Sequence, residues 1–454
     1  MNTVNNTNMI NDTSRYSFNN TDITDTINDA HTLKELFDEQ LVHLSPFGTT
    51  CYDVADFIKN DNKSKDFLNS FNYNKKLFPS DEGNNIKITK GRARHSAISL
   101  LLGLCIGDFC NLFGDCSSIF NNDLISYLYV NEPYINYKLW MCTATNHDYG
   151  YFSSYVTQMK MLNELPIKYD LFDDSLNWSK DFLTNFEPTY PRILKNSYQQ
   201  IKDYYLYSQN YHRKDNSLEK SDHGIIGGVL LYNRFIRNNI DNIKNTSASS
   251  LSFSRISDDI TYRDILYYKA SCLTICQHNI FKSNNSNSDK LYKNELSHLY
   301  HDRGYYIGRE HPLLLLLSLV DTIECVKTFS KKESESQYFQ TLTILNSVRL
   351  YSDKQKIIID FSELATKIYK DKPNSGLLTE LDKHIKSIIG MSNWTCLDVK
   401  QFSKSVYKNE ITAINNNQNK KEKGNYILII TYKERNNSEI INNADFYENA
   451  DFCI

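Results

Sequence analysis

The chain has 454 residues, of which 40% are hydrophobic and 23% charged, so it can bury a sizeable core and should form two or three structural units. Its 51 basic and 54 acidic residues give a net charge of -3 at pH 7, which excludes the broad basic surface of a sequence-independent nucleic-acid-binding protein. The sequence contains 10 cysteines but no Cys-x-x-Cys pair, which argues against a structural zinc site and favours buried free thiols.

The longest apolar runs are too short to cross a bilayer. They cover residues 97–106 and 313–320, and the N-terminus lacks the basic and then apolar pattern of a secretory signal. We therefore expect a cytoplasmic protein with no membrane partner.

The predicted elements are helical over the first three quarters of the chain. Residues 1–30 are rich in Asn, Thr and Asp and are expected to form a flexible leader, followed by an amphipathic helix at 31–44 and a second helix at 54–71. Further helices are expected at residues 96–113, 137–148 and 170–186, from Asp222 through 224–231, at 264–281, and from Pro312 to residue 329.

The pattern changes after residue 331. Two strands at 341–350 and 356–361, a helix at 377–389 and a hairpin of strands at 410–414 and 426–432 are expected in that order. The predicted fold is therefore mainly α. A leader at 1–30 precedes a helical domain at 31–330 and a smaller C-terminal α+β domain at 331–454, which could serve regulation or oligomerisation.

Six side chains that can bind a metal lie at the ends of the apolar helical segments or inside them. Asp321 ends the apolar run 313–320, and a carboxylate so placed needs a cation or several donors to offset its desolvation. The same reasoning applies to the adjacent His147 and Asp148, which follow a largely apolar stretch that begins at Trp140. Together these side chains predict a metal site formed by His95, His147, Asp148, His223, His278 and Asp321.

The order of these residues resembles that of the HD-domain metal-dependent phosphohydrolases, a superfamily with a helical core and the pattern H…HD…D. The matching segments are Arg94-His95, His147-Asp148-Tyr149-Gly150 and Asp321, and the resemblance covers roughly residues 90–330. His223 and His278 fit the two additional histidines of the members that hold two metals.

The resemblance implies an all-α bundle that holds one or two divalent metal ions, namely Mn, Fe, Co, Zn or Mg. Such ions activate a water for attack on phosphorus, and Asp148 would be the bridging ligand. Other positions would bind the substrate through phosphate or by stacking on a base or sugar: Lys90, Arg92, Arg94, Arg303, Arg309, Tyr149 and Tyr151. The catalytic residues would be Asp148, Arg94 and His311, with His311 as a general acid.

Three functions are compatible with this pattern. The first is hydrolysis of a nucleotide, a (deoxy)nucleoside triphosphate or related phosphate ester, as in the deoxynucleoside triphosphate triphosphohydrolases (dNTPases). The second is a phosphodiesterase acting on a cyclic or oligonucleotide signal. Here the chain departs from the HD-GYP enzymes, because Tyr151 replaces a lysine and Gln277-His278 replaces a His-His pair. The third is an HD module that binds a nucleotide without turnover. By the same resemblance we expect a homo-oligomer, and the C-terminal unit could bind a nucleotide effector.

Overall fold

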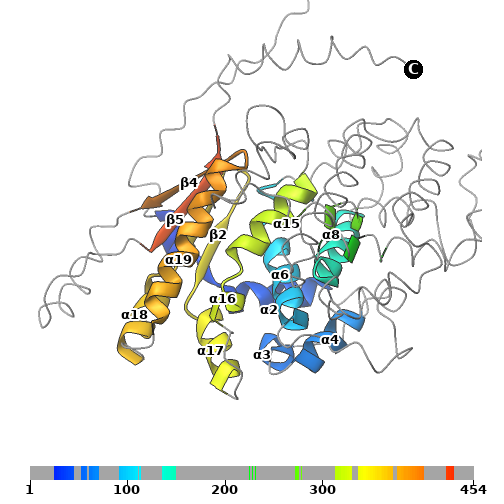
Figure 1. The fold of residues 1–454 in the computed structure, drawn as a ribbon, viewed down its shortest axis with the longest axis horizontal. Coiled ribbons are helices and arrows are strands. Elements are labelled where there is room, and N and C mark those ends of the chain that lie inside the picture. The colour runs from blue at the N-terminus through cyan, green and yellow to red at the C-terminus, as the bar shows by residue number, and fades with distance from the viewer. Residues whose placement is uncertain are drawn as a thin grey trace, which may run out of the picture.

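The computed structural model describes two groups of elements that pack on one another (Figure 1). Helices form one side of the molecule, and a small sheet with its covering helices forms the other. The described residues are 25–44, 53–58, 61–70, 92–110, 112–113, 135–149, 224, 227–228, 231, 271–272, 274–275, 278, 312–329, 336–371, 376–402 and 426–433. Within them the structure is mainly helical, as expected, and no helix is long and apolar enough to span a membrane.

The first described elements are shorter than the sequence predicted. Residues 31–32 form a strand, β1 (His31–Thr32), and α2 (Leu33–Leu44) begins directly after it. The boundary is set by a capping box: Thr32 Oγ1 accepts from the Glu35 amide at 3.2 Å, and the Glu35 carboxylate accepts from the Thr32 amide at 2.9 Å. The single helix expected at 54–71 is instead two helices, α3 (Val54–Phe57) and α4 (Asp61–Ser70).

Three buried helices form the centre of the helical side: α6 (Arg92–Ile106), α8 (Ile135–Asn146) and α15 (Pro312–Ile323). They correspond to three predicted helices, and Pro312 is the first residue of α15, where its missing N–H costs nothing. A short helix, α16 (Val326–Phe329), follows a break after α15.

The close approach of α6 to α8 depends on a glycine. The indole of Trp140 lies over Gly103, so that a Cβ at Gly103 would be 1.9 Å from Trp140 Cζ2. Trp140 Nε1 donates to the Leu100 carbonyl at 2.9 Å, which holds the ring in place. These contacts fix the two helices that carry His95 and His147.

Four strands of the C-terminal part and β1 form a five-stranded antiparallel sheet in the order β1-β2-β3-β5-β4. Its strands β3 (Lys356–Asp360) and β5 (Ile427–Tyr432) agree closely with expectation, as does α19 (Leu377–Gly390), whereas β2 (Arg349–Ser352) shares only residues 349 and 350 with the strand expected at 341–350. The other elements were not expected from the sequence: α17 (Ser336–Leu345), α18 (Ser362–Asp371), η5 (Met391–Asn393) and β4 (Leu397–Phe402).

The prediction of a strand over 341–350 was wrong for residues 341–348, because the strand begins only at Arg349. Within α17 and just after it, residues 341, 344, 345 and 348 are buried at helical spacing, and 341–345 complete α17. The strand expected at 410–414 lies outside the described residues.

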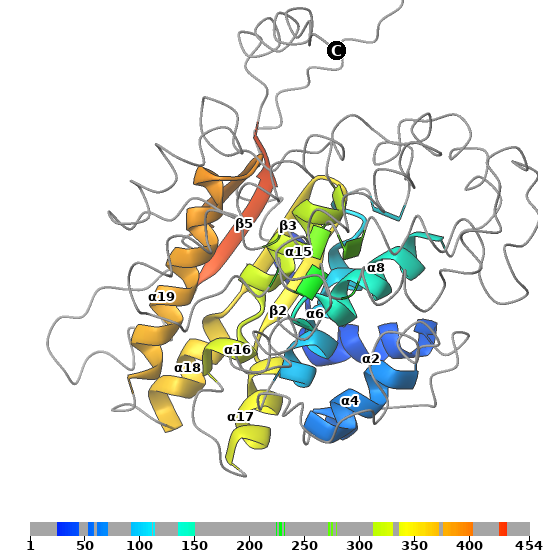
Figure 2. The ribbon, with the colours of Figure 1, turned by 45° about the vertical axis from the view of Figure 1, so that its right-hand side comes forward.

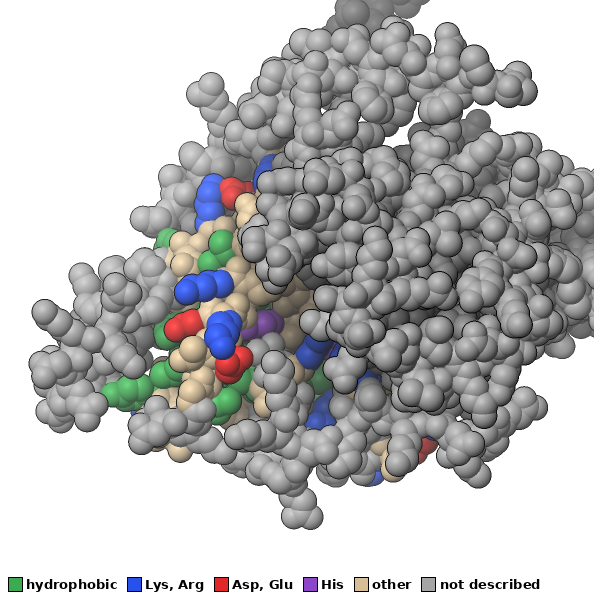
Figure 3. Space-filling view, in the orientation of Figure 1, with side chains coloured by type: hydrophobic (Ala, Val, Ile, Leu, Met, Phe, Trp, Pro, Cys, Tyr) green, Lys and Arg blue, Asp and Glu red, His purple; other side chains and the backbone are tan. Residues whose placement is uncertain are grey.

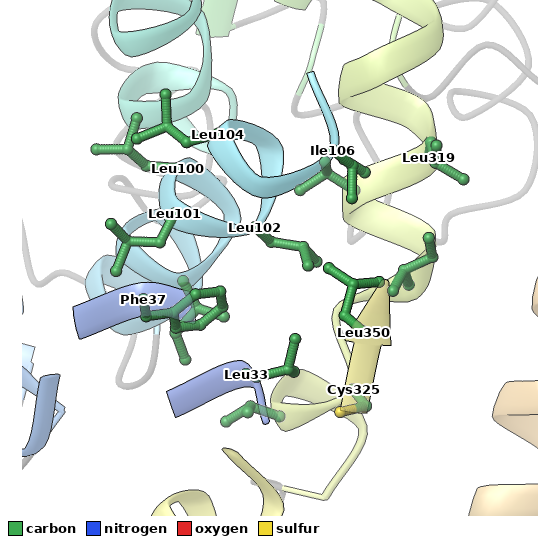
Figure 4. Close-up of a cluster of buried hydrophobic side chains, with 14 of the residues drawn as sticks. Leu33, Phe37, Leu100, Leu101, Leu102, Leu104, Ile106, Leu319, Cys325 and Leu350 are labelled. Atoms are coloured by element: carbon green, nitrogen blue, oxygen red, sulfur yellow. The ribbon is translucent and has the colours of Figure 1, made fainter. Parts of the chain in front are cut away.

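The helical side and the sheet side share one hydrophobic core. Figure 4 shows Leu102 of α6 facing Leu350 of β2, and the same cluster contains Leu33 and Phe37 of α2 and Leu319 of α15. Strand β1, from the beginning of the chain, pairs with β2, and Ile27 packs on the sheet against Ile358 and Ile427. The division of the chain at residue 331 stays a prediction, but the described elements on its two sides are packed together.

Helix α15 is the element between the two groups. In Figures 1 and 2 it lies between α6 and α8 on one side and the sheet with α18 and α19 on the other, and it contacts α6, α8 and α19. Basic, acidic and apolar side chains are mixed on the described face in Figure 3.

Candidate metal centre

Three helices that are far apart in the sequence bring their polar residues together. His95 lies in the first turn of α6, His147 and Asp148 directly follow α8, and Asp321 is in the last turn of α15. His95, His147 and Asp148 are buried, with exposed fractions of 4%, 0% and 1%. Several polar side chains buried at one point need each other or a cation as partners.

His95, His147 and Asp321 form a group that could hold a metal ion. One ligand atom from each residue lies within 4.8 Å of the others. His95 Nε2 is 3.0 Å from Asp321 Oδ1 and 3.1 Å from His147 Nε2. Two imidazoles and a carboxylate are a donor set suited to Mn, Fe, Co or Zn.

In each imidazole, Nδ1 forms a hydrogen bond outside the group, and this bond turns Nε2 towards the group. His147 Nδ1 lies 2.7 Å from the Ala144 carbonyl, and His95 Nδ1 lies 2.9 Å from Glu324 Oε2. Both partners can only accept, so both Nδ1 atoms donate, and the inward Nε2 atoms can present lone pairs. Two lone pairs and a carboxylate oxygen at 3.0–3.1 Å repel one another unless a cation or a proton lies among them. The residues therefore fit a metal ion.

In the absence of a metal, protonation of His95 provides the positive charge that the group needs. Burial and the charge of Lys327 lower its pKa, but hydrogen bonds to Asp321 and Glu324 and the charge of Asp148 outweigh them and raise the pKa from 6.5 to about 9. Burial lowers the pKa of His147. A proton on His95 thus occupies the position that a metal would take.

The carboxylates stay ionised. Burial raises the pKa of Asp321, but the charge of Lys327 and the hydrogen bond from His95 hold it well below its ordinary value. Burial likewise opposes ionisation of Glu324, while the hydrogen bond from His95 lowers its pKa. Both side chains remain available as anions for a cation.

Asp148 lies at the edge of the group. Its Oδ2 is 3.6 Å from His95 Nε2, and its Oδ1 is 3.8 Å from His147 Nε2. Arg92, one turn before His95 on α6, forms an ion pair with Asp148 through Nη1 and Oδ2 at 2.9 Å. Arg92, which the sequence placed among the substrate-binding residues, is thus in contact with the site.

Two contacting residues were missed by the sequence reasoning, Glu324 and Lys327. Glu324 follows Asp321 by three residues, which is the spacing of neighbours on one helix face, so this signal was present in the sequence. Lys327 Nζ lies 2.9 Å from Asp321 Oδ1. A continuous helix would separate residues 321 and 327 by roughly 9 Å along its axis and on different faces.

The break after α15 brings Lys327 back towards Asp321. The Glu324 carboxylate accepts from the Val326 amide at 2.7 Å and from the Lys327 amide at 3.0 Å, and so caps α16. One side chain thus orients His95 and redirects the chain. The break was not visible in the sequence, because residues 322–329 read as a continuation of the helix that begins at Pro312.

Of the remaining residues expected in the site, the structure describes only some. The His278 ring lies 5.6 Å from the His147 ring between centroids, and its Nδ1 is 2.7 Å from the Ile275 carbonyl. A Cβ at Gly224 would be 2.9 Å from His278 Nδ1, so this glycine allows close packing. Arg94 and Tyr149 are buried, each at 8% exposure. Six expected residues lie outside the described part of the chain: Lys90, Tyr151, His223, Arg303, Arg309 and His311.

In comparisons with known proteins, no family model, no curated protein and no solved structure matches this chain. The chemistry of the site follows from its own donors: two imidazoles and a carboxylate converge, a second carboxylate lies at the edge, and Arg92 and Lys327 each contact one carboxylate.

Proposed function

We propose that this protein is a metal-dependent phosphohydrolase of the HD type that acts on a nucleotide. The observation that supports it best is the convergence of His95, His147 and Asp321 with Asp148 beside them. These four residues stand in the sequence in the order H…HD…D that carries the resemblance, and they come from segments up to 226 residues apart.

His95, His147, Asp148 and Asp321 would hold the first ion, and His278 with His223 would serve a second. A divalent ion at this position supplies Lewis-acid activation of water and neutralises phosphoryl oxygens. The chain itself orients the ligands, because Glu324 fixes the His95 ring and the Ala144 carbonyl fixes the His147 ring. Burial of the ligands limits bulk water and strengthens every charge interaction at the site.

The substrate we propose is a (deoxy)nucleoside triphosphate or a related phosphate ester. Arg92 lies at the edge of the cluster, and its guanidinium can bind phosphate oxygens in a bidentate manner. His311, as general acid, and Tyr149 and Tyr151, as surfaces for a base or sugar, complete the proposal. The departures at Tyr151 and Gln277 make a cyclic dinucleotide the weaker candidate.

The test combines metal content with turnover. Protein purified without a histidine tag is measured by elemental analysis, and the same sample is incubated with a panel of nucleotides and Mn²⁺ or Fe²⁺. We expect one or two transition ions per chain and release of phosphate or triphosphate. Asp148→Ala should lose turnover and retain less metal, whereas Asp398→Ala, on β4, should keep both.

Two outcomes would contradict the proposal. Full activity and unchanged metal content in Asp148→Ala would show that the site lies elsewhere. A wild-type chain that binds nucleotide but binds no metal and shows no turnover would be a binding module.

A further inference from the structure

Two basic side chains contact the same carboxylate oxygens that face His95. Lys327 Nζ and His95 Nε2 lie 2.9 Å and 3.0 Å from Asp321 Oδ1. Arg92 Nη1 and His95 Nε2 lie 2.9 Å and 3.6 Å from Asp148 Oδ2. A cation bound beside His95 through these oxygens would meet both basic groups at like-charge distance.

These basic groups are the most accessible part of the cluster. The side chains of Lys327 and Arg92 are 40% and 23% exposed and that of Asp321 is 19% exposed, whereas those of Asp148 and Glu324 are 1% and 0% exposed. Access from solvent to the buried ligands thus passes beside two cations. Such a rim attracts an anion once its charges are not engaged by carboxylates.

The charge balance becomes more positive when a metal enters. The carboxylates of Asp148, Asp321 and Glu324 carry three negative charges, and Arg92 and Lys327 carry two positive ones. With neutral imidazoles, a bound divalent ion brings the cluster to an excess of one positive charge, whereas the metal-free cluster has no positive excess whether or not His95 carries a proton. The metal-loaded cluster therefore attracts an anion more strongly than the metal-free cluster does.

We propose that Arg92 and Lys327 are exchangeable counter-ions: a divalent metal displaces them from Asp148 and Asp321, and they then bind the phosphate groups of the substrate. The inference rests on the proposed function and deepens it by assigning a substrate-binding role to Lys327. It also makes phosphate binding dependent on prior metal binding.

The local structure suits this exchange. The Lys327 amide is bonded to the Glu324 carboxylate at 3.0 Å, so its backbone is anchored while its long side chain can rotate. Arg92 begins α6, one helical turn before His95, and so can turn towards a ligand bound at that residue.

The test is Lys327→Met, which removes the charge and keeps most of the side-chain length. Because Lys327 competes with the metal for Asp321, this variant should bind Mn²⁺ alone several-fold more tightly in a calorimetric titration. With Mn²⁺ saturating, it should bind inorganic triphosphate about tenfold more weakly, because one charge-assisted contact is lost. The two affinities are expected to change in opposite directions.

Two variants serve as controls. Lys327→Arg keeps the charge and should retain both affinities within about twofold. Lys367→Met removes a lysine of similar exposure, 37%, from its pair with Glu363 on α18 and should change neither affinity. Thermal unfolding of each variant with and without Mn²⁺ verifies that the protein is folded.

The outcomes separate this inference from the proposed function. If wild-type protein binds Mn²⁺ but Lys327→Met leaves both affinities unchanged, or weakens both, the exchange is wrong while the metal site stands. If wild-type protein binds no divalent metal, the proposed function fails as well.

Discussion

His95 uses both of its ring nitrogens, and this makes Glu324 important for the site. Nδ1 is held by Glu324 at 2.9 Å, which turns Nε2 towards Asp321 and His147. Loss of a group that orients a metal-binding histidine typically costs 10–100-fold in metal affinity. Loss of Glu324 should therefore weaken metal binding at this site.

We predict that Glu324→Ala lowers the affinity for Mn²⁺ or Zn²⁺ by about 10–100-fold. The His95 ring loses its anchor, and α16 loses its cap. Competition with a metallochromic indicator measures the effect, and Glu363→Ala on α18 is the surface control. Unchanged affinity in Glu324→Ala would show that Glu324 does not orient His95 for metal binding.

A second prediction concerns pH. The metal-free pKa of His95 is raised to about 9, so below that value a bound metal must displace a proton. Metal affinity should therefore rise by about tenfold per pH unit between pH 7 and 8.5, with about one proton released per ion. Calorimetry in buffers of different ionisation enthalpy counts the protons, and Glu324→Gln should release fewer. No proton release at pH 7.5 would contradict the assignment.

The same pKa has a consequence for stability. The pKa of His95 in the folded protein lies above its pKa of about 6.5 in the unfolded chain. Protonation of His95 therefore stabilises the metal-free fold fully below pH 6.5. This contribution is lost as pH rises through about 9. The metal-free protein should therefore lose stability in this alkaline range, and bound metal should remove the dependence.

The candidate metal-binding residues could be predicted from the sequence where an apolar surrounding makes a buried charge energetically unfavourable. Asp321 and His147-Asp148 end largely apolar stretches, and a buried charge there needs a partner. The contact of Lys327 with Asp321 could not be found this way, because it depends on a helix break created by the Glu324 side chain itself.

At the scale of elements, the spacing of α6 and α8 sets the position of the two histidines. Gly103 lies under Trp140, and the indole is fixed by its bond to the Leu100 carbonyl. Alanine is favoured over glycine in a helix by about 1 kcal/mol. A Cβ at residue 103 would lie 1.9 Å from Trp140 Cζ2. This clash outweighs the preference for alanine, because neither helix can move without disturbing the core.

We predict that Gly103→Ala destabilises the protein by about 1–3 kcal/mol and weakens metal binding. Gly390→Ala, at the end of α19, is the matched control, since a Cβ there meets nothing within 4 Å. Urea unfolding of both variants measures the difference. Equal stability of the two would show that the helices can separate without cost.

Helices formed by long apolar stretches, such as α6 and α15, were predicted well, whereas elements set by their partners were not. Strand β1 has two residues and exists because β2 offers an edge, a fact absent from its own sequence. The end of α17, residues 341–345, was read as a strand because of its β-branched residues, although its buried spacing is helical.

At the scale of the whole molecule, the shared core argues against independent folding of the two parts. Residues after 330 supply Leu345, Val348 and Leu350 to the cluster that also contains Leu33 and Phe37. Removing them would expose the apolar faces of α2 and α15 to water.

We predict that a chain truncated after residue 330 does not fold cooperatively. A chain truncated after residue 433 retains every described residue and serves as the control. Circular dichroism and size-exclusion chromatography distinguish the two. A soluble 1–330 fragment with a sharp melting transition would instead support two separable domains.

The pairing of β1 with β2 also concerns synthesis of the chain. His31 pairs with Leu350, and the Leu33 amide donates to the Val348 carbonyl at 2.9 Å. At about 5–20 residues per second, the ribosome needs on the order of 15–60 seconds to make the intervening chain. During that interval β1 lacks the strand with which it pairs, so the N-terminal edge of the sheet forms only after most of the chain has been made.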